Sequence, residues 1–151
     1  MKHIDHTVDL CVVGGGLAGV CAAIAAARHG SSVVLMQDRP VLGGNASGEV
    51  RMWVCGAHGD NNRETGILEE IELENFYRNT GLNYSVWDSV VYEKAYLQEG
   101  LTLLLNTTCQ TAQMHGNRIT SVTGWQRRPR RITRYRRNSL PIARATAFWR
   151  R

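Results

Sequence analysis

The chain has 151 residues, of which 43% are hydrophobic, enough apolar material for one globular domain with a packed core. It contains no apolar run of about 18 residues and no apolar signal segment at its start, so we expect neither a membrane span nor secretion. The four cysteines, at positions 11, 21, 55 and 109, form no C-x-x-C pair. This spacing favours reduced thiols in a cytoplasmic protein over disulfides or a metal site.

The first secondary-structure elements predicted along the chain form a βαβ unit. Residues Thr7–Val13 predict a short buried parallel strand, because Leu10, Val12 and Val13 are apolar without strict alternation. The alanine-rich segment Leu17–His29 predicts a helix that Gly30 ends, and Ser32–Gln37 predicts a second strand rich in β-branched residues. A strand, a glycine turn, a helix and a strand within about 30 residues form a βαβ unit, whose crossover should be right-handed.

The turn of this unit carries the pattern G-x-G-x-x-G at Gly14, Gly16 and Gly19. The first glycine permits a tight turn, the second lets the backbone approach a pyrophosphate, and the third lets helix and strand pack closely. The helix N-terminus then presents free N–H groups to phosphate. We therefore predict a dinucleotide site formed by Gly14, Gly15, Gly16, Leu17, Ala18 and Gly19.

The second strand of such a unit usually ends in an acid that holds a ribose hydroxyl. Gln37 occupies the expected position, and Asp38 follows one residue later. Gln37 can still hydrogen-bond a hydroxyl, but without charge assistance. Both residues are candidate ribose contacts, and the alternative for Asp38 is that it only begins a turn.

The next segment, R-P-V-L-G-G-N from Arg39 to Asn45, brings a second glycine pair, Gly43 and Gly44. Together with G-G-G-L-A-G at Gly14–Gly19, it resembles the FAD-dependent oxidoreductases of the glutathione-reductase-like superfamily. The resemblance implies that Arg39, Gly43, Gly44 and Asn45 help to bind FAD. The usual strand-ending glutamate is replaced by Gln37.

The resemblance extends with decreasing specificity to Gln126 and includes G-E-V-R-M-W-V-C-G-A-H-G from Gly48 to Gly59. It implies that this segment lies near the flavin. Arg51 is then a candidate ligand of a cofactor phosphate or a substrate carboxylate. Cys55 and His58 are candidate catalytic residues, with the alternative that they are structural. The absence of a C-x-x-C or C-x4-C pair disfavours a disulfide-reductase mechanism.

Later segments predict a long ordered loop, two helices and a small β-meander. Glycine-rich residues 40–59 predict the loop, and apolar spacings of three and four predict helices over 62–79 and 86–98. Leu101–Thr107 predicts a strand, and the residues at 111–114 and 118–124 predict a hairpin about His115–Asn117. The expected fold class is α/β: a Rossmann-like FAD-binding βαβ unit with a parallel sheet, followed by helices, a β-meander and an irregular basic tail.

The charge of the chain changes sign after Gln126. Residues 1–126 hold 8 Lys and Arg against 13 Asp and Glu, a net charge of −5, whereas residues 127–151 hold ten arginines and no acid. Such a tail can bind nucleic acid, with Tyr135 and Trp149 stacking on bases. We favour a different explanation, that the tail from about Arg127 is translated out of frame and disordered.

The out-of-frame explanation rests on back-translation of the tail. Codons chosen within the degeneracy of Leu140–Arg150 read Ala-Asp-Cys-Ser-Gly-Asp-Gly-Ile-Leu-Ala when regrouped from the third base of the Leu140 codon. This resembles the second FAD-contact motif of the family, A-D-x-x-G-D-G, which the chain otherwise lacks. We therefore expect residues 1–126 to form an incomplete FAD-binding domain that is inactive by itself.

The function predicted from the sequence is the N-terminal FAD-binding portion of a flavin-dependent oxidoreductase. Its partner would be a small-molecule substrate, with no membrane partner and no metal. Two alternatives remain open: an NAD(P)-binding Rossmann domain, and a nucleic-acid-binding protein that uses the basic tail, which we disfavour.

Overall fold

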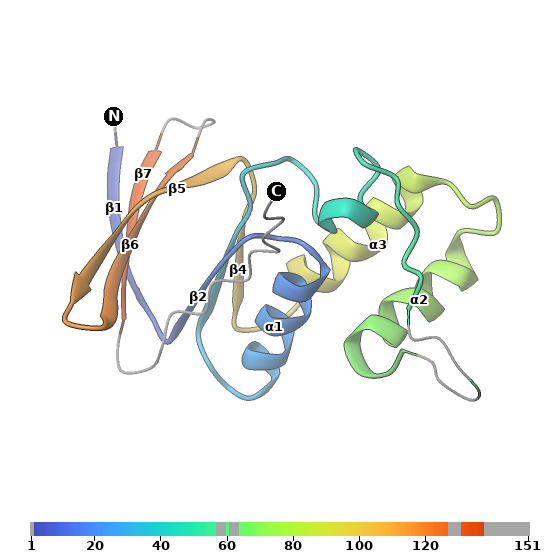
Figure 1. Ribbon diagram of the computed structural model, residues 1–151, viewed down its shortest axis with the longest axis horizontal. Coiled ribbons are helices and arrows are strands. Elements are labelled where there is room, and N and C mark those ends of the chain that lie inside the picture. Colours follow the sequence, from blue (N-terminus) through green and yellow to red (C-terminus); the bar gives the residue numbers. More distant parts are fainter. Residues whose placement is uncertain (1, 57–59, 61–63, 127–130, 138–151) are drawn as a thin grey trace.

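A computed structural model describes residues 2–56, 60, 64–126 and 131–137. Its centre is a parallel sheet of three strands in the order β2-β3-β4: Leu10–Val13, Val33–Met36 and Leu101–Leu104. All four residues of β3 are buried, because β3 lies between two strands and both faces of the sheet are covered. Helix α1, Leu17–Arg28, crosses from β2 to β3 (Figure 1). The Rossmann-like α/β fold predicted from the sequence is confirmed.

Two further helices cover the same side of the sheet as α1 (Figure 1). Helix α2 spans Gly66–Arg78 and α3 spans Tyr84–Tyr96. Asn79 connects them, because its amide donates to Asn75 Oδ1 and to the Asn83 carbonyl, both at 2.9 Å. Arg78 on α2 forms a two-point ion pair with Glu93 on α3. These contacts fix α2 against α3.

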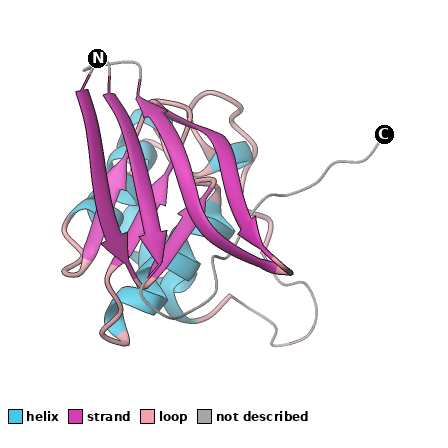
Figure 2. Ribbon diagram, turned by 90° about the vertical axis from the view of Figure 1, so that its left-hand side faces the viewer, coloured by secondary structure: helices cyan, strands magenta, loops and turns pink. Residues whose placement is uncertain are grey.

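The second sheet has four strands in the order β1-β7-β6-β5 and forms the opposite layer (Figure 2). The strands are β1 Lys2–Val8, β5 Thr107–His115, β6 Arg118–Gln126 and β7 Arg131–Arg137. Strands β5, β6 and β7 form an antiparallel meander, and β1 pairs with β7 in parallel. The hairpin predicted about His115–Asn117 is confirmed.

Each side of the parallel sheet has its own core. Val20, Ile24 and Leu35 belong to the larger cluster, which also includes buried residues of α2 and α3. Cys11, Val34 and Met36 pack toward the second sheet, against Val122 of β6. Alternate residues of β2 and β3 therefore face the two cores.

The structure corrects the predicted element boundaries at two places. The single strand Thr7–Val13 is two strands, because the chain turns at Asp9, whose carboxylate accepts from the Ser32 N–H at 2.9 Å and the Ser32 hydroxyl at 2.7 Å. The strand Leu101–Thr107 ends at Leu104, because Asn106 adopts a left-handed conformation with φ of 53°. Both turns carry the chain from one sheet to the other.

The structure also corrects the prediction of an irregular tail from Arg127. Residues Arg131–Arg137 form β7, paired on both edges by β6 and β1. Main-chain hydrogen bonds make this pairing available to any sequence without proline, and Ile132, Thr133 and Tyr135 have high strand propensity. The prediction of disorder for 138–151 lies outside the described residues.

Candidate functional site

The first glycine turn joins the end of β2 to the start of α1. Gly14 has φ of 110°, a conformation that favours glycine, and its N–H donates to the Met36 carbonyl at 2.8 Å. Gly16 is the N-cap residue of α1, and no side chain caps the helix. A Cβ added to Gly16 would meet nothing within 4 Å. The turn is therefore open to an approaching group at Gly16.

The second glycine turn packs directly on the first. The Gly43 N–H donates to the Gly15 carbonyl at 2.8 Å, and Gly16 and Gly43 form a parallel β-bridge. A Cβ added to Gly44 would lie 3.2 Å from Gly16 Cα. The two motifs, in which Gly16 and Gly43 are 27 positions apart, thus meet backbone to backbone. Gly43 and Gly44 both have positive φ, which explains why glycine occupies both positions.

Gln37 connects these turns through its side chain. Its Oε1 accepts from the Gly15 N–H at 3.0 Å, and its Nε2 donates to the Val41 carbonyl at 3.1 Å. The residue is only 7% exposed. Both polar ends of the amide are therefore engaged inside the protein. Asp38, the other predicted ribose contact, is exposed and its carboxylate is not held in this way.

A cavity of about 470 Å³ lies between the end of β3 and the second sheet. Gly14, Gln37 and Asp38 form one wall, and β5 and β6 form the other. The opposite wall comprises Thr107, Thr108, Cys109, Gln110, Ala112, Ile119 and Val122. Sequence reasoning missed this wall, because only the fold brings the meander to the glycine turn.

The remaining predicted cofactor residues have differing environments. Leu17 packs against the larger core and Gly19 is buried, whereas Ala18 and Asn45 are exposed. Asn45 lies in the short 3-10 helix η1, Gly44–Ala46. Arg39 is exposed and forms an ion pair with Glu49 at 2.8 Å. The structure therefore brings Asn45 to the glycine turns and engages Arg39 with the following loop.

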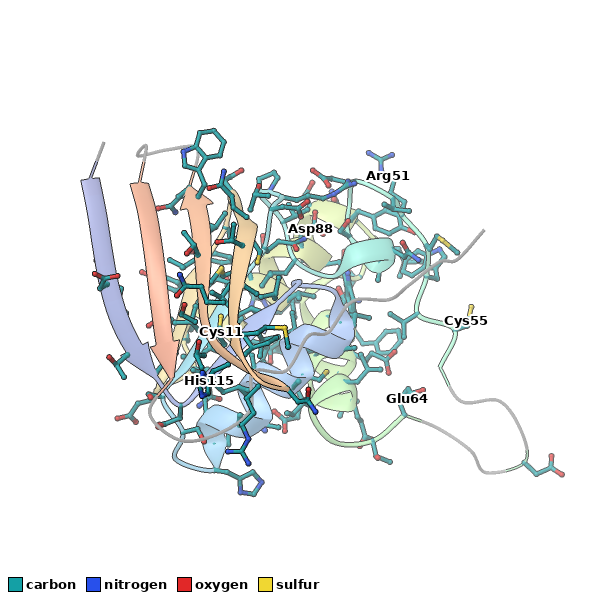
Figure 3. The ribbon with its side chains drawn as sticks, turned by 60° about the vertical axis from the view of Figure 1, so that its left-hand side comes forward. Cys11, Arg51, Cys55, Glu64, Asp88 and His115 are labelled. Atoms are coloured by element: carbon teal, nitrogen blue, oxygen red, sulfur yellow. The ribbon has the colours of Figure 1, made fainter. Side chains whose placement is uncertain are left out.

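Arg51 lies in that loop, which α3 holds in place (Figure 3). The Gly48 N–H donates to Asp88 Oδ1 at 2.7 Å, and the Tyr84 hydroxyl donates to the Arg51 carbonyl at 2.8 Å. The Arg51 guanidinium also stacks 5.9 Å from the centre of the Tyr84 ring. These contacts offset the positive φ of Arg51, 63°. Asp88 and Tyr84 could not be predicted as part of the site, because their contacts join residues far apart in the sequence.

Of the two predicted catalytic residues, the structure describes Cys55. Cys55 is exposed, and its Sγ lies 3.8 Å from the Trp53 carbonyl (Figure 3). His58 lies outside the described residues.

Among the residues that the structure describes, no group of three His, Cys, Asp or Glu side chains could hold a metal ion. No helix in this part of the chain is long and apolar enough to cross a membrane.

Comparison with known families identifies residues 9–136 as matching the model of the FAD dependent oxidoreductase family. The chain belongs to this family. The match continues past Gln126 into β7, beyond the boundary at which the charge changes. FAD is the cofactor of the family, so the cofactor predicted from the two glycine motifs agrees with the comparison.

Curated relatives match over short segments. An NADH:acrylate oxidoreductase of Vibrio harveyi is 52% identical over 44 residues, which are 29% of this chain and 4% of the relative. A fumarate reductase (cytochrome) of Shewanella frigidimarina is 55% identical over 40 residues, which are 26% of this chain and 7% of the relative. The match therefore covers less than a tenth of either relative.

Solved structures share the fold over almost the whole chain. L-proline dehydrogenase from P. horikoshii has a TM-score of 0.58 and 19% identity, covering 97% of this chain and 24% of the other. A myxobacterial chondrochloren halogenase, described as FAD-dependent, has a TM-score of 0.61 and 12% identity, covering 95% and 38%. At these identities the likeness establishes the fold.

Proposed function

We propose that this chain is the FAD-binding portion of a flavin-dependent oxidoreductase and binds the ADP moiety of FAD at the Gly14–Gly19 turn. The observation that carries the proposal is the backbone contact between the two glycine turns. Gly43 bonds to Gly15, and Gly44 approaches Gly16 too closely for most side chains. Two turns without side chains at their contact leave main-chain N–H groups accessible to a phosphate group.

The first turn fits a pyrophosphate chemically. Helix α1 has no acidic residue in its first turn and no side-chain cap, so its N-terminal N–H groups and dipole are available to an anion. The open space at Gly16 is on the side where a Cβ would otherwise project. In this proposal the turn that accommodates the pyrophosphate is formed by the backbone of Gly14, Gly15 and Gly16. The first turn of the helix is formed by Leu17, Ala18 and Gly19.

The ribose would be held by Asp38. Asp38 lines the 470 Å³ cavity and is exposed, whereas the amide of Gln37 bonds to Gly15 and Val41. Gln37 therefore acts by positioning the two glycine turns. The same cavity, with its mixed polar and apolar walls on β5 and β6, is the candidate site for the adenosine.

FAD, when bound, supplies the redox chemistry by accepting a hydride or an electron pair. The chain's own residues bind and orient it. Arg51 is proposed to contact a cofactor phosphate or the carboxylate of a small-molecule substrate, because α3 fixes its backbone while its guanidinium stays exposed. Cys55 and His58 remain candidate catalytic residues by resemblance.

Isothermal titration calorimetry of the chain with FAD, and separately with NAD⁺, tests which cofactor binds. We expect FAD to bind and ADP to compete with it, because the glycine turns would hold the part that both molecules share. Mass spectrometry of the cofactor released from the purified protein provides a second measurement. Preferential binding or release of NAD(P) would favour the alternative, an NAD(P)-binding Rossmann domain.

A further inference from the structure

A second cavity, of about 250 Å³, is lined by the loop at residues 46–54 and by helices α2 and α3. These two helices lie on the side of the molecule away from the second sheet (Figure 1). Four aromatic side chains line the cavity, and they come from three parts of the chain: Trp53, Phe76, Tyr84 and Trp87. The Trp53 and Tyr84 rings lie 5.0 Å apart between centroids and are tilted by 38°. Two walls of the cavity are therefore aromatic surfaces at an angle to each other.

One carboxylate, that of Glu72 on α2, also lines this aromatic cavity. Burial raises the pKa of Glu72, and the neighbouring carboxylates of Glu64 and Glu69 raise it further. No described residue forms an ion pair with Glu72, although Glu70 and Glu74 on the same helix both have basic partners. No basic residue is among those that line the cavity. Among the residues that the structure describes, Glu72 is therefore the one charged group at the cavity wall, and it has no basic partner there.

We propose that the aromatic cavity binds an organic ammonium ion, with Glu72 as the counter-charge and Trp53, Phe76, Tyr84 and Trp87 as the aromatic walls. Aromatic faces attract a cation through their quadrupole, and aromatic cages are a general means of recognising quaternary ammonium groups. An anion would instead meet Glu72 and the electron-rich ring faces. The volume of about 250 Å³ limits the ligand to a small one.

The Arg51 guanidinium shows that the Tyr84 ring already attracts a cation. Arg51 lies 5.9 Å from the Tyr84 centroid but is not among the residues that line the cavity. It would repel a second cation, whereas Glu72, on the helix across the cavity, would attract it. The ammonium group is therefore placed toward Glu72 and Phe76, with any polar remainder of the ligand toward Arg51.

None of the described residues that line the aromatic cavity also lines the cavity of about 470 Å³ that is the candidate site for the adenosine. Ala46, at the end of η1, is the one residue of the second glycine loop that reaches the aromatic cavity. The inference needs only the folded chain and no bound flavin. Failure to bind an ammonium ion would therefore not contradict the proposed FAD binding, and failure to bind FAD would not contradict the ammonium site. Each is decided by its own titration.

Three probes of matched shape test the cavity: choline, its neutral isostere 3,3-dimethyl-1-butanol, and the anion 3,3-dimethylbutanoate. Each is titrated into the full chain at constant ionic strength and followed by saturation-transfer NMR of its methyl singlet. We expect choline to bind about tenfold more tightly than the alcohol and the anion to bind weakest. Equal affinity for choline and the alcohol, tighter binding of the anion, or no binding of any probe to the folded chain would overturn the proposal.

Glu72→Gln keeps the shape of the side chain and removes its charge, so it should abolish most of the preference for choline over the alcohol. Glu74→Gln, on the same helix but outside the cavity, is the matched control and should leave the preference unchanged. Trp53→Leu keeps an apolar side chain without the ring and should weaken choline about threefold while sparing the alcohol. Circular dichroism establishes folding of each variant. Equal effects of Glu72→Gln and Glu74→Gln would contradict the assignment.

Discussion

The side-chain oxygen of Gln37 lies 3.0 Å from the Gly15 nitrogen, so the residue that directly follows β3 holds the glycine turn that follows β2. The amide nitrogen of the same side chain bonds to the Val41 carbonyl, just before the second glycine pair. A glutamate at this position could accept from Gly15 but could not donate to Val41. Glutamine is thus suited to connecting the two turns.

Replacing Gln37 by leucine should destabilise the chain, because it leaves the buried Gly15 N–H and the Val41 carbonyl without their partners. We expect a loss of about 2 kcal/mol in the free energy of unfolding, measured by urea denaturation. FAD affinity should fall as well, since the turns lose their common support. Gln98→Leu, at a half-buried glutamine whose side-chain oxygen accepts from Arg28 at the surface, is the control. Unchanged stability of Gln37→Leu would contradict the positioning role.

Asp38→Asn should weaken FAD binding without affecting stability, because the carboxylate is exposed and its proposed partner is the ribose. Loss of charge assistance corresponds to about a fivefold increase in Kd, measured by calorimetry. Asp5→Asn, an exposed carboxylate on β1, should have no effect. If Gln37 rather than Asp38 held the ribose, Asp38→Asn would bind FAD as the wild type does.

The sequence predicted the glycine turns and the βαβ unit because both depend on local constraints. Gly14 needs a positive φ, and the alanines of α1 favour a helix wherever they occur. The inward orientation of Gln37 was not predictable, because it depends on Val41 and Gly15, which the fold brings together. The same holds for the Asp88 contact with Gly48, which joins residues 40 positions apart.

Strand β7 shows a different limit of sequence reasoning. Its composition, rich in arginine, indicated a tail outside the fold. Residues 131–137 nevertheless pair with β6 on one edge and, over seven positions, with β1 on the other. Charge composition reports on the side chains, whereas strand pairing uses the main chain. A segment whose composition does not indicate a strand can therefore still pair with the edge of β6.

Gly16→Val should abolish FAD binding and leave the protein folded. A Cβ at this position meets nothing within 4 Å in the protein, so the added side chain would occupy only the space assigned to the pyrophosphate. We expect at least about a 100-fold increase in Kd, roughly 2.7 kcal/mol, with an unchanged circular dichroism spectrum. Gly81→Val, which also meets nothing but lies between α2 and α3, should still bind FAD. Unchanged flavin stoichiometry in Gly16→Val would refute the placement of the site.

The cysteines should react with iodoacetamide in an order set by burial. Burial raises the pKa of Cys11 to about 12, with a smaller contribution from Cys109, whereas Cys55 is exposed. Peptide mass spectrometry at pH 8 should find Cys55 alkylated first and Cys11 only after unfolding. Because the folded pKa of Cys11 exceeds its ordinary value of 9.0, its thiol should also lower the stability of the chain as pH rises from 9 toward 12. Early alkylation of Cys11 in the folded chain would contradict its buried position.

The gene should show a change of reading frame after the codon for Gln126 and before that for Leu140. The family match ends at residue 136, and the codons available to Leu140–Arg150 can encode Ala-Asp-Cys-Ser-Gly-Asp-Gly-Ile-Leu-Ala in a shifted frame. By resemblance, that segment is the second FAD-contact motif of the family. Restoring the frame should therefore strengthen FAD binding, measured by the same calorimetric titration as for this chain. Nucleotide sequencing across these codons decides the point: a gene with no open frame that continues the motif downstream would exclude the frame change.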